Sequence, residues 1–122
     1  MKLRSHFLPT LNNQEVEDYL KENDVIFVPV GPVEMHGALP LDCETVVSEA
    51  LALLLAQRTN SLVLPNIPYI YSGATASGRG TVELSIKGSI AFLSEIAHRL
   101  LRQGFKRQVY LSLHGPAHMS VS

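Results

Sequence analysis

The sequence has little cysteine, almost no net charge and no long hydrophobic run, and each shortage excludes a class of protein. Cys43 is the single cysteine, so no disulfide can form within the chain, which is typical of a reducing compartment. A formal net charge of −1 gives no electrostatic attraction for nucleic acid or an anionic membrane. Apolar runs such as Ala50–Ala56 are too short to span a bilayer, and the N-terminal residues lack the apolar core of a secretory signal. We therefore expect a cytoplasmic protein that binds neither nucleic acid nor membrane.

The composition is that of one folded domain. The chain has 122 residues, of which 46% are hydrophobic and 17% are charged, and chains of this composition are globular rather than disordered. The length supports a modest hydrophobic core. Because there is no internal repeat and no low-complexity tract, we expect residues 1–122 to form a single domain.

Helices and strands are expected to alternate along the chain. The hydrophobic pattern predicts helices at 14–22, 43–57 and 86–103, and strands at 25–30, 61–64 and 107–113. Asp42 is the expected N-cap of the second helix, which is apolar over most of its circumference and should therefore be well buried. Strands that alternate with helices form a parallel sheet with right-handed crossovers. The expected fold class is therefore α/β, a three-layer α/β/α arrangement with a mainly parallel sheet.

Potential metal ligands gather just after the first expected strand. The run 25–30 ends at a Gly-Pro turn, and four candidates follow it: Glu34, His36, Asp42 and Glu44. Carboxylate oxygen and imidazole nitrogen are donors that zinc and manganese accept. His114 follows the last expected strand, and side chains beyond the carboxyl ends of parallel strands share one sheet edge. These residues predict a metal site at that edge, although Asp42 can instead cap the next helix and Glu44 can instead favour the helix dipole.

Three segments of the chain resemble the creatininase (creatinine amidohydrolase) family. They are PVGPVEMHGALPLDCE at 29–44, the Gly-Thr step at 80–81, and GFKRQVY at 104–110 leading into Leu-His-Gly at 113–115. Together they span nearly all of the chain. The resemblance implies a creatininase-like fold that holds two divalent metal ions, zinc or manganese or both. Carried over by position, the implied metal ligands are Glu34, His36, Glu44 and His114.

Two further residues are alternative ligands under this resemblance. The loop after His36 is one residue shorter than the family pattern, and Asp42 replaces Glu44 as the carboxylate that bridges the metals if the register changes there. We favour Glu44, because Asp42 is the expected helix cap. His118 is the other alternative, because Pro116 stands where some family members have a glutamate ligand.

The resemblance implies an enzyme that hydrolyses the C–N bond of a small cyclic or linear amide. Water activated between the two ions would attack the carbonyl carbon. The segment 69–79, YIYSGATASGR, resembles a substrate-covering loop with Tyr71, Ser72 and Gly73 as candidate contacts, and a plain surface connection is the alternative. No residue of the chain stands out as the acid that protonates the leaving nitrogen, and the resemblance places that group in the second half of the family's domain.

Family members are much longer than this chain, so the resemblance covers their N-terminal half. The chain could be a separately encoded half, a cleavage product, or a truncated domain without activity. A sheet of only three or four strands leaves an unpaired edge, so we expect a homo-oligomer or a complementary C-terminal-half chain as partner. The alternatives to a split amidohydrolase are a non-catalytic half-subunit and a metal-free ligand-binding domain.

Overall fold

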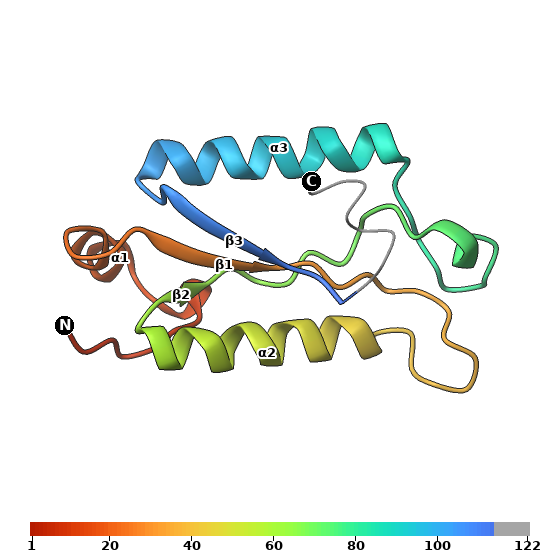
Figure 1. Cartoon of the computed structure of the whole chain (residues 1–122), viewed down its shortest axis with the longest axis horizontal. Coiled ribbons are helices and arrows are strands. Elements are labelled where there is room, and N and C mark those ends of the chain that lie inside the picture. The colour runs from red at the N-terminus through yellow and green to blue at the C-terminus, as the bar shows by residue number, and fades with distance from the viewer. Residues whose placement is uncertain (114–122) are drawn as a thin grey trace.

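The computed structural model describes residues 1–113, which form helices on both faces of a small parallel sheet (Figure 1). Figure 1 shows α3 on one side of the sheet and α2 on the other, so the predicted three-layer α/β/α fold is confirmed. The elements in chain order are η1 (Leu8–Thr10), α1 (Asn13–Leu20), β1 (Val25–Pro29), α2 (Cys43–Thr59), β2 (Leu62–Val63), η2 (Gly73–Thr75), α3 (Ile86–Gln103) and β3 (Arg107–Leu111).

β1 is the central strand of the sheet. The strands run parallel in the order β2-β1-β3. β1 pairs with β3 along its whole length, from Val25 opposite Arg107 to Pro29 opposite Leu111. Parallel strands of this kind are covered on both faces, and β1 is accordingly buried at four of its five positions. The carboxyl end of β1 therefore delivers the following residues from the centre of the fold.

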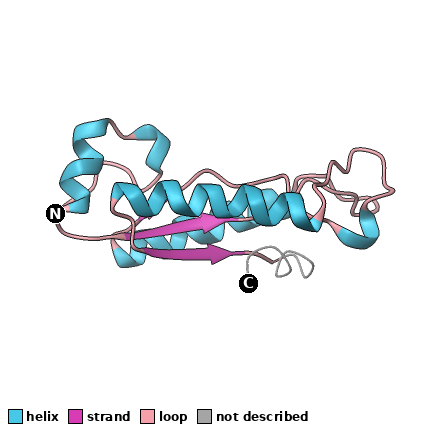
Figure 2. Ribbon diagram, turned by 90° about the horizontal axis from the view of Figure 1, so that it is seen from above, coloured by secondary structure: helices cyan, strands magenta, loops and turns pink. Residues whose placement is uncertain are grey.

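The two edges of the sheet differ. The backbone N–H of Val63 in β2 donates to the His6 carbonyl at 2.8 Å, so the N-terminal segment covers that edge. β3 forms the other edge, and among residues 1–113 no strand pairs with its far side. Figure 2 shows β3 as the outermost strand. Val109 of β3 is 39% exposed and Leu113 just beyond it is 58% exposed, so this edge presents both backbone groups and apolar side chains.

The hydrophobic core lies in two clusters, one on each face of β1. Successive residues of a strand point to opposite faces, and Ile26 and Val28 accordingly belong to the cluster that includes α3. Phe27 belongs to the cluster that includes α2. The α3 cluster is the larger, and its other members include Tyr19, Leu62, Ile70, Leu93, Leu100 and Phe105. The α2 cluster is completed by Ala52, Ala56 and Val63.

The expectation that α2 is well buried is wrong. Its buried residues are Ser48, Ala52 and Ala56, whereas Val46 is 58% exposed and Leu54 is 47% exposed. A helix that covers one face of a narrow sheet buries a single stripe, whatever the composition of its other sides. The alanines form that stripe because their small side chains let the helix approach β1 closely. Leu53 and Leu55 pack partly against the core, whereas Val46, Val47 and Leu54 lie on the outer side of α2.

Asp42 does not cap α2 as expected. It occupies the N-cap position, but its side chain makes no capping hydrogen bond. The backbone of Asp42 has φ −96° and ψ 15°, outside the extended conformation from which a capping side chain reaches the free amides of the first turn. Asn12 begins α1 with a capping box, and Gly104, with φ 111°, ends α3.

Candidate metal centre

The chain after β1 meets the start of α2 at the carboxyl edge of the sheet. Figure 1 shows this segment, the N-terminal end of α2 and the loop with η2 at one end of the molecule. A Cβ atom on Gly31 would lie 2.4 Å from the Glu44 carbonyl oxygen and 2.9 Å from the Ser48 hydroxyl. Only glycine permits so close an approach. The first turn of α2 therefore packs directly on the backbone that leaves β1.

A group of polar side chains fixes this junction, and we call Thr45, Glu49 and Asn66 the Gly31 clamp. The Asn66 amide accepts from Gly31 N–H and donates to the Gly31 carbonyl, both at 2.9 Å. Thr45 Oγ1 donates to the same carbonyl at 2.8 Å. The Asn66 backbone N–H donates to Glu49 Oε2 at 3.0 Å. Because these partly buried polar groups are hydrogen-bonded in one network, the loop after β1 and the start of α2 are held as one unit.

This unit brings Glu34, His36 and Glu44 together, and we call them the ligand cluster. His36 Nε2 lies 3.3 Å from Glu34 Oε1 and 3.3 Å from Glu44 Oε1. Each residue offers one potential ligand atom, and these atoms lie within 4.8 Å of one another. The Glu34 side chain is 2% exposed and that of Glu44 is 16% exposed. The His36 Nε2 atom is shielded from solvent and has no hydrogen-bond partner among the described residues.

The ligand cluster fits a divalent metal ion. One imidazole nitrogen and two carboxylate oxygens are a donor set suited to zinc or manganese. Ligand atoms placed about 2.0–2.1 Å from a tetrahedral zinc ion lie about 3.3 Å apart, and this matches both distances from His36 Nε2. The two carboxylates also give the cluster the negative charge that attracts a cation.

The segment that contains η2 packs against the ligand cluster. Thr75 Oγ1 donates a short hydrogen bond to Glu34 Oε2, and Met35 N–H donates to Thr81 Oγ1 at 2.8 Å. Glu83 closes the segment, because its Oε2 accepts from the N–H groups of Ser72 and Gly73 at 3.0 and 3.3 Å. The segment 72–83 is thus a closed loop whose inner side touches Glu34.

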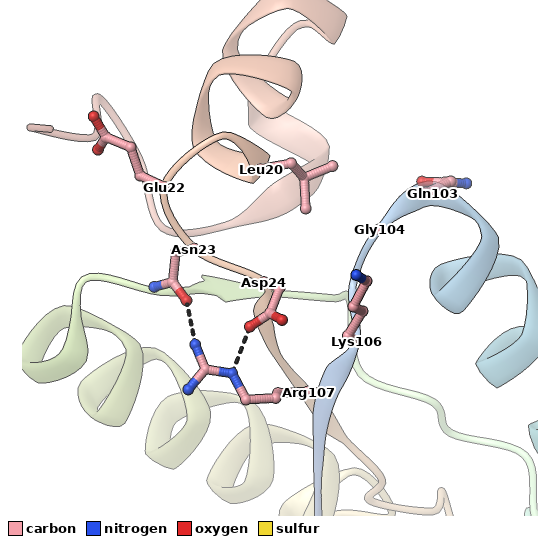
Figure 3. Close-up of a pocket in the computed structure, with 8 residues that line it drawn as sticks. All are labelled: Leu20, Glu22, Asn23, Asp24, Gln103, Gly104, Lys106 and Arg107. Carbon is pink, nitrogen blue, oxygen red and sulfur yellow. Dashed lines mark hydrogen bonds and ion pairs between the residues drawn. The ribbon is translucent and has the colours of Figure 1, made fainter.

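A cavity of about 490 Å³ lies away from this cluster, where the α1–β1 and α3–β3 turns meet (Figure 3). Two of its charged side chains bind each other, since Arg107 Nε donates to Asp24 Oδ1 at 2.5 Å. Arg107 Nη2 also donates to Asn23 Oδ1 at 3.3 Å. This cavity adjoins the amino ends of the strands, and its ion pair ties β3 to the start of β1.

A sequence profile described as creatininase (creatinine amidohydrolase) matches residues 9–121, which include the whole ligand cluster. The chain belongs to the creatininase family. The predicted family is therefore confirmed, over nearly the whole sequence.

Two curated relatives show how much of a family member this chain covers. It is 29% identical over 111 residues to a 3-dehydro-scyllo-inosose hydrolase of Thermotoga maritima, covering 89% of this chain and 36% of that protein. It is 28% identical over 118 residues to a creatinine amidohydrolase of Pseudomonas putida, covering 91% of this chain and 45% of that protein. The chain thus spans less than half the length of these two curated relatives.

Solved creatininase structures share the fold. A crystal structure of creatinine amidohydrolase (creatininase) superposes with a TM-score of 0.89 at 28% identity, covering 98% of this chain and 49% of that chain. A structure described as manganese creatininase gives a TM-score of 0.89 at 27% identity, with 97% and 49% of the two chains covered. A variant described as the Zn-Zn type gives 0.86 at 26% identity, with 98% and 49% covered. These last two structures are thus a manganese form and a zinc form of creatininase.

The structure brings together some of the predicted site residues but not others. Glu34, His36 and Glu44 lie together, as the sequence predicted. Asp42 is exposed and is not part of the ligand cluster. His114 and His118 lie outside the described residues. Of the predicted substrate loop, Tyr71 is partly exposed and Ser72 is buried, while the backbone amides of Ser72 and Gly73 are used to close the loop.

Sequence reasoning missed the residues that support the ligands. Thr75 contacts Glu34 from 41 positions away, and Asn66 contacts Gly31 from 35 positions away. Neither residue belongs to a motif, and hydroxyl and amide side chains are common in loops. The sequence offered one general signal, which is that the segment 66–85, where both residues lie, is rich in polar residues and glycine.

Within residues 1–113, none of the helices combines the length and the apolar character needed to cross a membrane.

Proposed function

We propose that this chain supplies the metal-binding half of a metal-dependent hydrolase that cleaves a C–N bond in a small cyclic or linear amide. The observation that carries the proposal is the ligand cluster, in which His36 lies 3.3 Å from a carboxylate oxygen of Glu34 and of Glu44. Membership of the creatininase family supports it, as does the 28% identity to a creatinine amidohydrolase. The second relative is an inosose hydrolase, so both curated relatives are hydrolases although their substrates differ.

Glu34, His36 and Glu44 would hold the ion, and we propose His114, which follows β3 in the sequence, as a further ligand. Two ions, zinc or manganese or both, would share the site, with Glu44 as the bridging carboxylate. Glu44 is favoured over Asp42 because it lies in the cluster and Asp42 does not. His118 remains an alternative ligand.

The residues of the chain prepare the site for this chemistry. When bound, the ions supply a water nucleophile at neutral pH and polarise the amide carbonyl. Glu34 and Glu44 would provide the negative charge that holds divalent cations, and His36 would provide a nitrogen donor. The buried position of Glu34 limits water at one side of the site. We assign the acid that protonates the leaving nitrogen to polypeptide beyond these residues.

We further propose that residues 1–122 form one domain unit equivalent to the N-terminal half of a creatininase domain. The chain superposes on 49% of a solved creatininase, and β3 presents an unpaired edge among the described residues. A complementary C-terminal-half chain or a second copy of this chain would pack against that edge. The main alternative is a non-catalytic half-subunit, and loss of amide hydrolysis on adding a chelator would favour the enzyme.

Two single variants test the metal centre. Glu44→Gln should lower the affinity for Zn²⁺ or Mn²⁺ by more than about 100-fold, because losing a ligand costs more than losing a group that only orients one. Asp42→Asn is the matched control, since it removes an exposed carboxylate two residues away and should leave the affinity unchanged. The measurement is a competition titration of each protein against a metal-binding dye, with elemental analysis of the purified samples.

The opposite pattern would contradict the assignment. If Asp42→Asn abolished metal binding and Glu44→Gln retained it, the bridging carboxylate would be Asp42. If both variants bound metal as tightly as the unmodified chain, the ligand cluster would not be the metal centre.

A further inference from the structure

We propose that Thr75 is a positioning residue for the metal centre. Its hydroxyl holds one oxygen of Glu34, so the carboxylate presents only its other oxygen to a divalent ion. This inference rests on the proposed function, because it assumes that Glu34 is a metal ligand. It adds a role for the loop 72–83 that neither the motif nor the family resemblance assigns.

The two oxygens of Glu34 have different partners. Oε2 accepts the hydrogen bond from Thr75 Oγ1, and Oε1 is the oxygen that lies 3.3 Å from His36 Nε2. The Glu34 side chain is 2% exposed, so bulk water has little access to replace the threonine hydroxyl. A buried carboxylate is costly unless it is hydrogen-bonded. Thr75 therefore satisfies one buried oxygen of Glu34 and fixes which oxygen faces the cluster.

Thr75 is itself fixed by the loop that carries it. Glu83 Oε2 ties the backbone amides of Ser72 and Gly73, which precede Thr75. The Thr75 carbonyl accepts from Gly78 N–H at 2.9 Å. The β-branched side chain of threonine also has few accessible rotamers. The hydroxyl is thus delivered to Glu34 by a braced backbone rather than by a mobile side chain.

The hydrogen bond from Thr75 would determine which oxygen of Glu34 coordinates the ion. With Oε2 held toward the loop by Thr75, Glu34 would bind the ion through Oε1 and leave the remaining coordination positions to other ligands. Groups that hydrogen-bond to a metal ligand typically contribute about 10–100-fold to metal affinity. We expect Thr75 to contribute within this range, although it does not touch the ion.

Three variants of the 122-residue chain separate this role from general loop anchoring. Thr75→Val removes the hydroxyl and keeps the shape, and Thr75→Ser keeps the hydroxyl. Thr81→Val is the matched control, because it removes a second side-chain hydrogen bond between the loop 72–83 and the segment after β1, from Met35 N–H at 2.8 Å, at a residue that does not contact a candidate ligand side chain. Each protein is titrated with Zn²⁺ in competition with a dye and with Co²⁺ monitored by visible absorption.

The expected result is a loss of about 10–100-fold in affinity for Thr75→Val, with affinities near that of the unmodified chain for Thr75→Ser and Thr81→Val. The Co²⁺ bands of Thr75→Val should also change in intensity, because the released Oε2 can then enter the coordination sphere. If Thr75→Val fails to fold, as judged by circular dichroism, Thr75→Ala is measured against the same criteria.

Two outcomes would overturn the inference. One is an affinity and a Co²⁺ spectrum of Thr75→Val that match those of the unmodified chain. The other is an equal loss in Thr81→Val, which would mean that docking of the loop, and not the contact with Glu34, sustains binding. Failure of the unmodified chain to bind either ion would instead overturn the proposed metal centre, and the role of Thr75 with it.

Discussion

His36 lies between two carboxylates, an arrangement that a bound cation would stabilise. A neutral imidazole can donate a proton from Nε2 to one acceptor only, whereas oxygens of Glu34 and Glu44 both lie 3.3 Å from that nitrogen. Like charges held close together in a partly buried site repel each other. A divalent ion among the three side chains would compensate both negative charges and accept the imidazole lone pair. This balance is the residue-level reason for proposing a metal centre.

Another carboxylate, Glu15 in α1, links stability to pH. Hydrogen bonds from Arg4, and then from the Asn12 backbone N–H, lower the pKa of Glu15 from 4.5 to about 2. Since the pKa is lower in the folded state, Glu15 stabilises the fold above its unfolded pKa, and this contribution is lost as the pH falls from about 4.5 toward 2. We expect the stability difference between the unmodified chain and Glu15→Gln to shrink as the pH is lowered from 6 toward 3.

Thermal unfolding at several pH values, for both proteins, measures this difference. The interaction is solvent-exposed, so added salt should reduce it at neutral pH. A stability difference that stayed constant between pH 6 and pH 3 would show that Glu15 is not held in its charged form by Arg4 and Asn12.

At this scale the sequence predicted which candidate ligands lie together, but not the residues that support them. Glu34, His36 and Glu44 could be predicted together because they follow a strand whose carboxyl end must lie at the functional edge of a parallel sheet. Thr75 could not, because its contact with Glu34 depends on the path of the whole loop 66–85. Long-range contacts of this kind arise from tertiary packing and leave no periodic signal in the sequence.

Among the elements, α2 shows most clearly what hydrophobic composition can and cannot predict. The apolar run correctly predicted a helix, which spans Cys43–Thr59. It did not predict which side of the helix is buried, because nearly every side is apolar. Ala52 is fully buried, whereas Val47 is 50% exposed. The side of α2 with small residues faces the sheet, because small side chains allow the closest packing on β1.

Two substitutions in α2 test this orientation. Ala52→Leu should destabilise the fold by about 1–3 kcal/mol, because the larger side chain is forced into a packed site. Val47→Gln should change stability by no more than about 0.5 kcal/mol, as is usual at an exposed position. Urea denaturation followed by circular dichroism measures both. Similar losses in the two variants would show that the outer side of α2 is buried in solution.

The bounds of the strands were less predictable than their existence. The second strand was expected at 61–64 and is only Leu62–Val63, and the third was expected to reach Leu113 and ends at Leu111. A strand ends where the neighbouring strand no longer provides backbone N–H and C=O groups to pair with. β3 follows β1 only as far as Pro29, and this limit is a property of the pair that neither segment reveals alone.

On the scale of the whole molecule, one edge of the sheet is covered and the other is not, among residues 1–113. The edge of β2 is covered by the N-terminal segment, whose His6 carbonyl accepts from Val63 N–H. The edge of β3 has no strand beyond it among residues 1–113. Natural proteins rarely leave a flat apolar edge uncovered, and solved creatininases extend to about twice the aligned length, since this chain covers 49% of one. Both facts support our proposal that additional polypeptide completes the domain and its active site.

Native mass spectrometry of the purified protein, before and after incubation with Zn²⁺ or Mn²⁺, tests the central claim most directly. Our account predicts bound transition-metal ions, with two expected at full occupancy, on a species heavier than a single chain. That species would be an oligomer of the chain or a complex with a complementary polypeptide. A metal-free single chain under all these conditions would contradict the claim that Glu34, His36 and Glu44 form a metal centre.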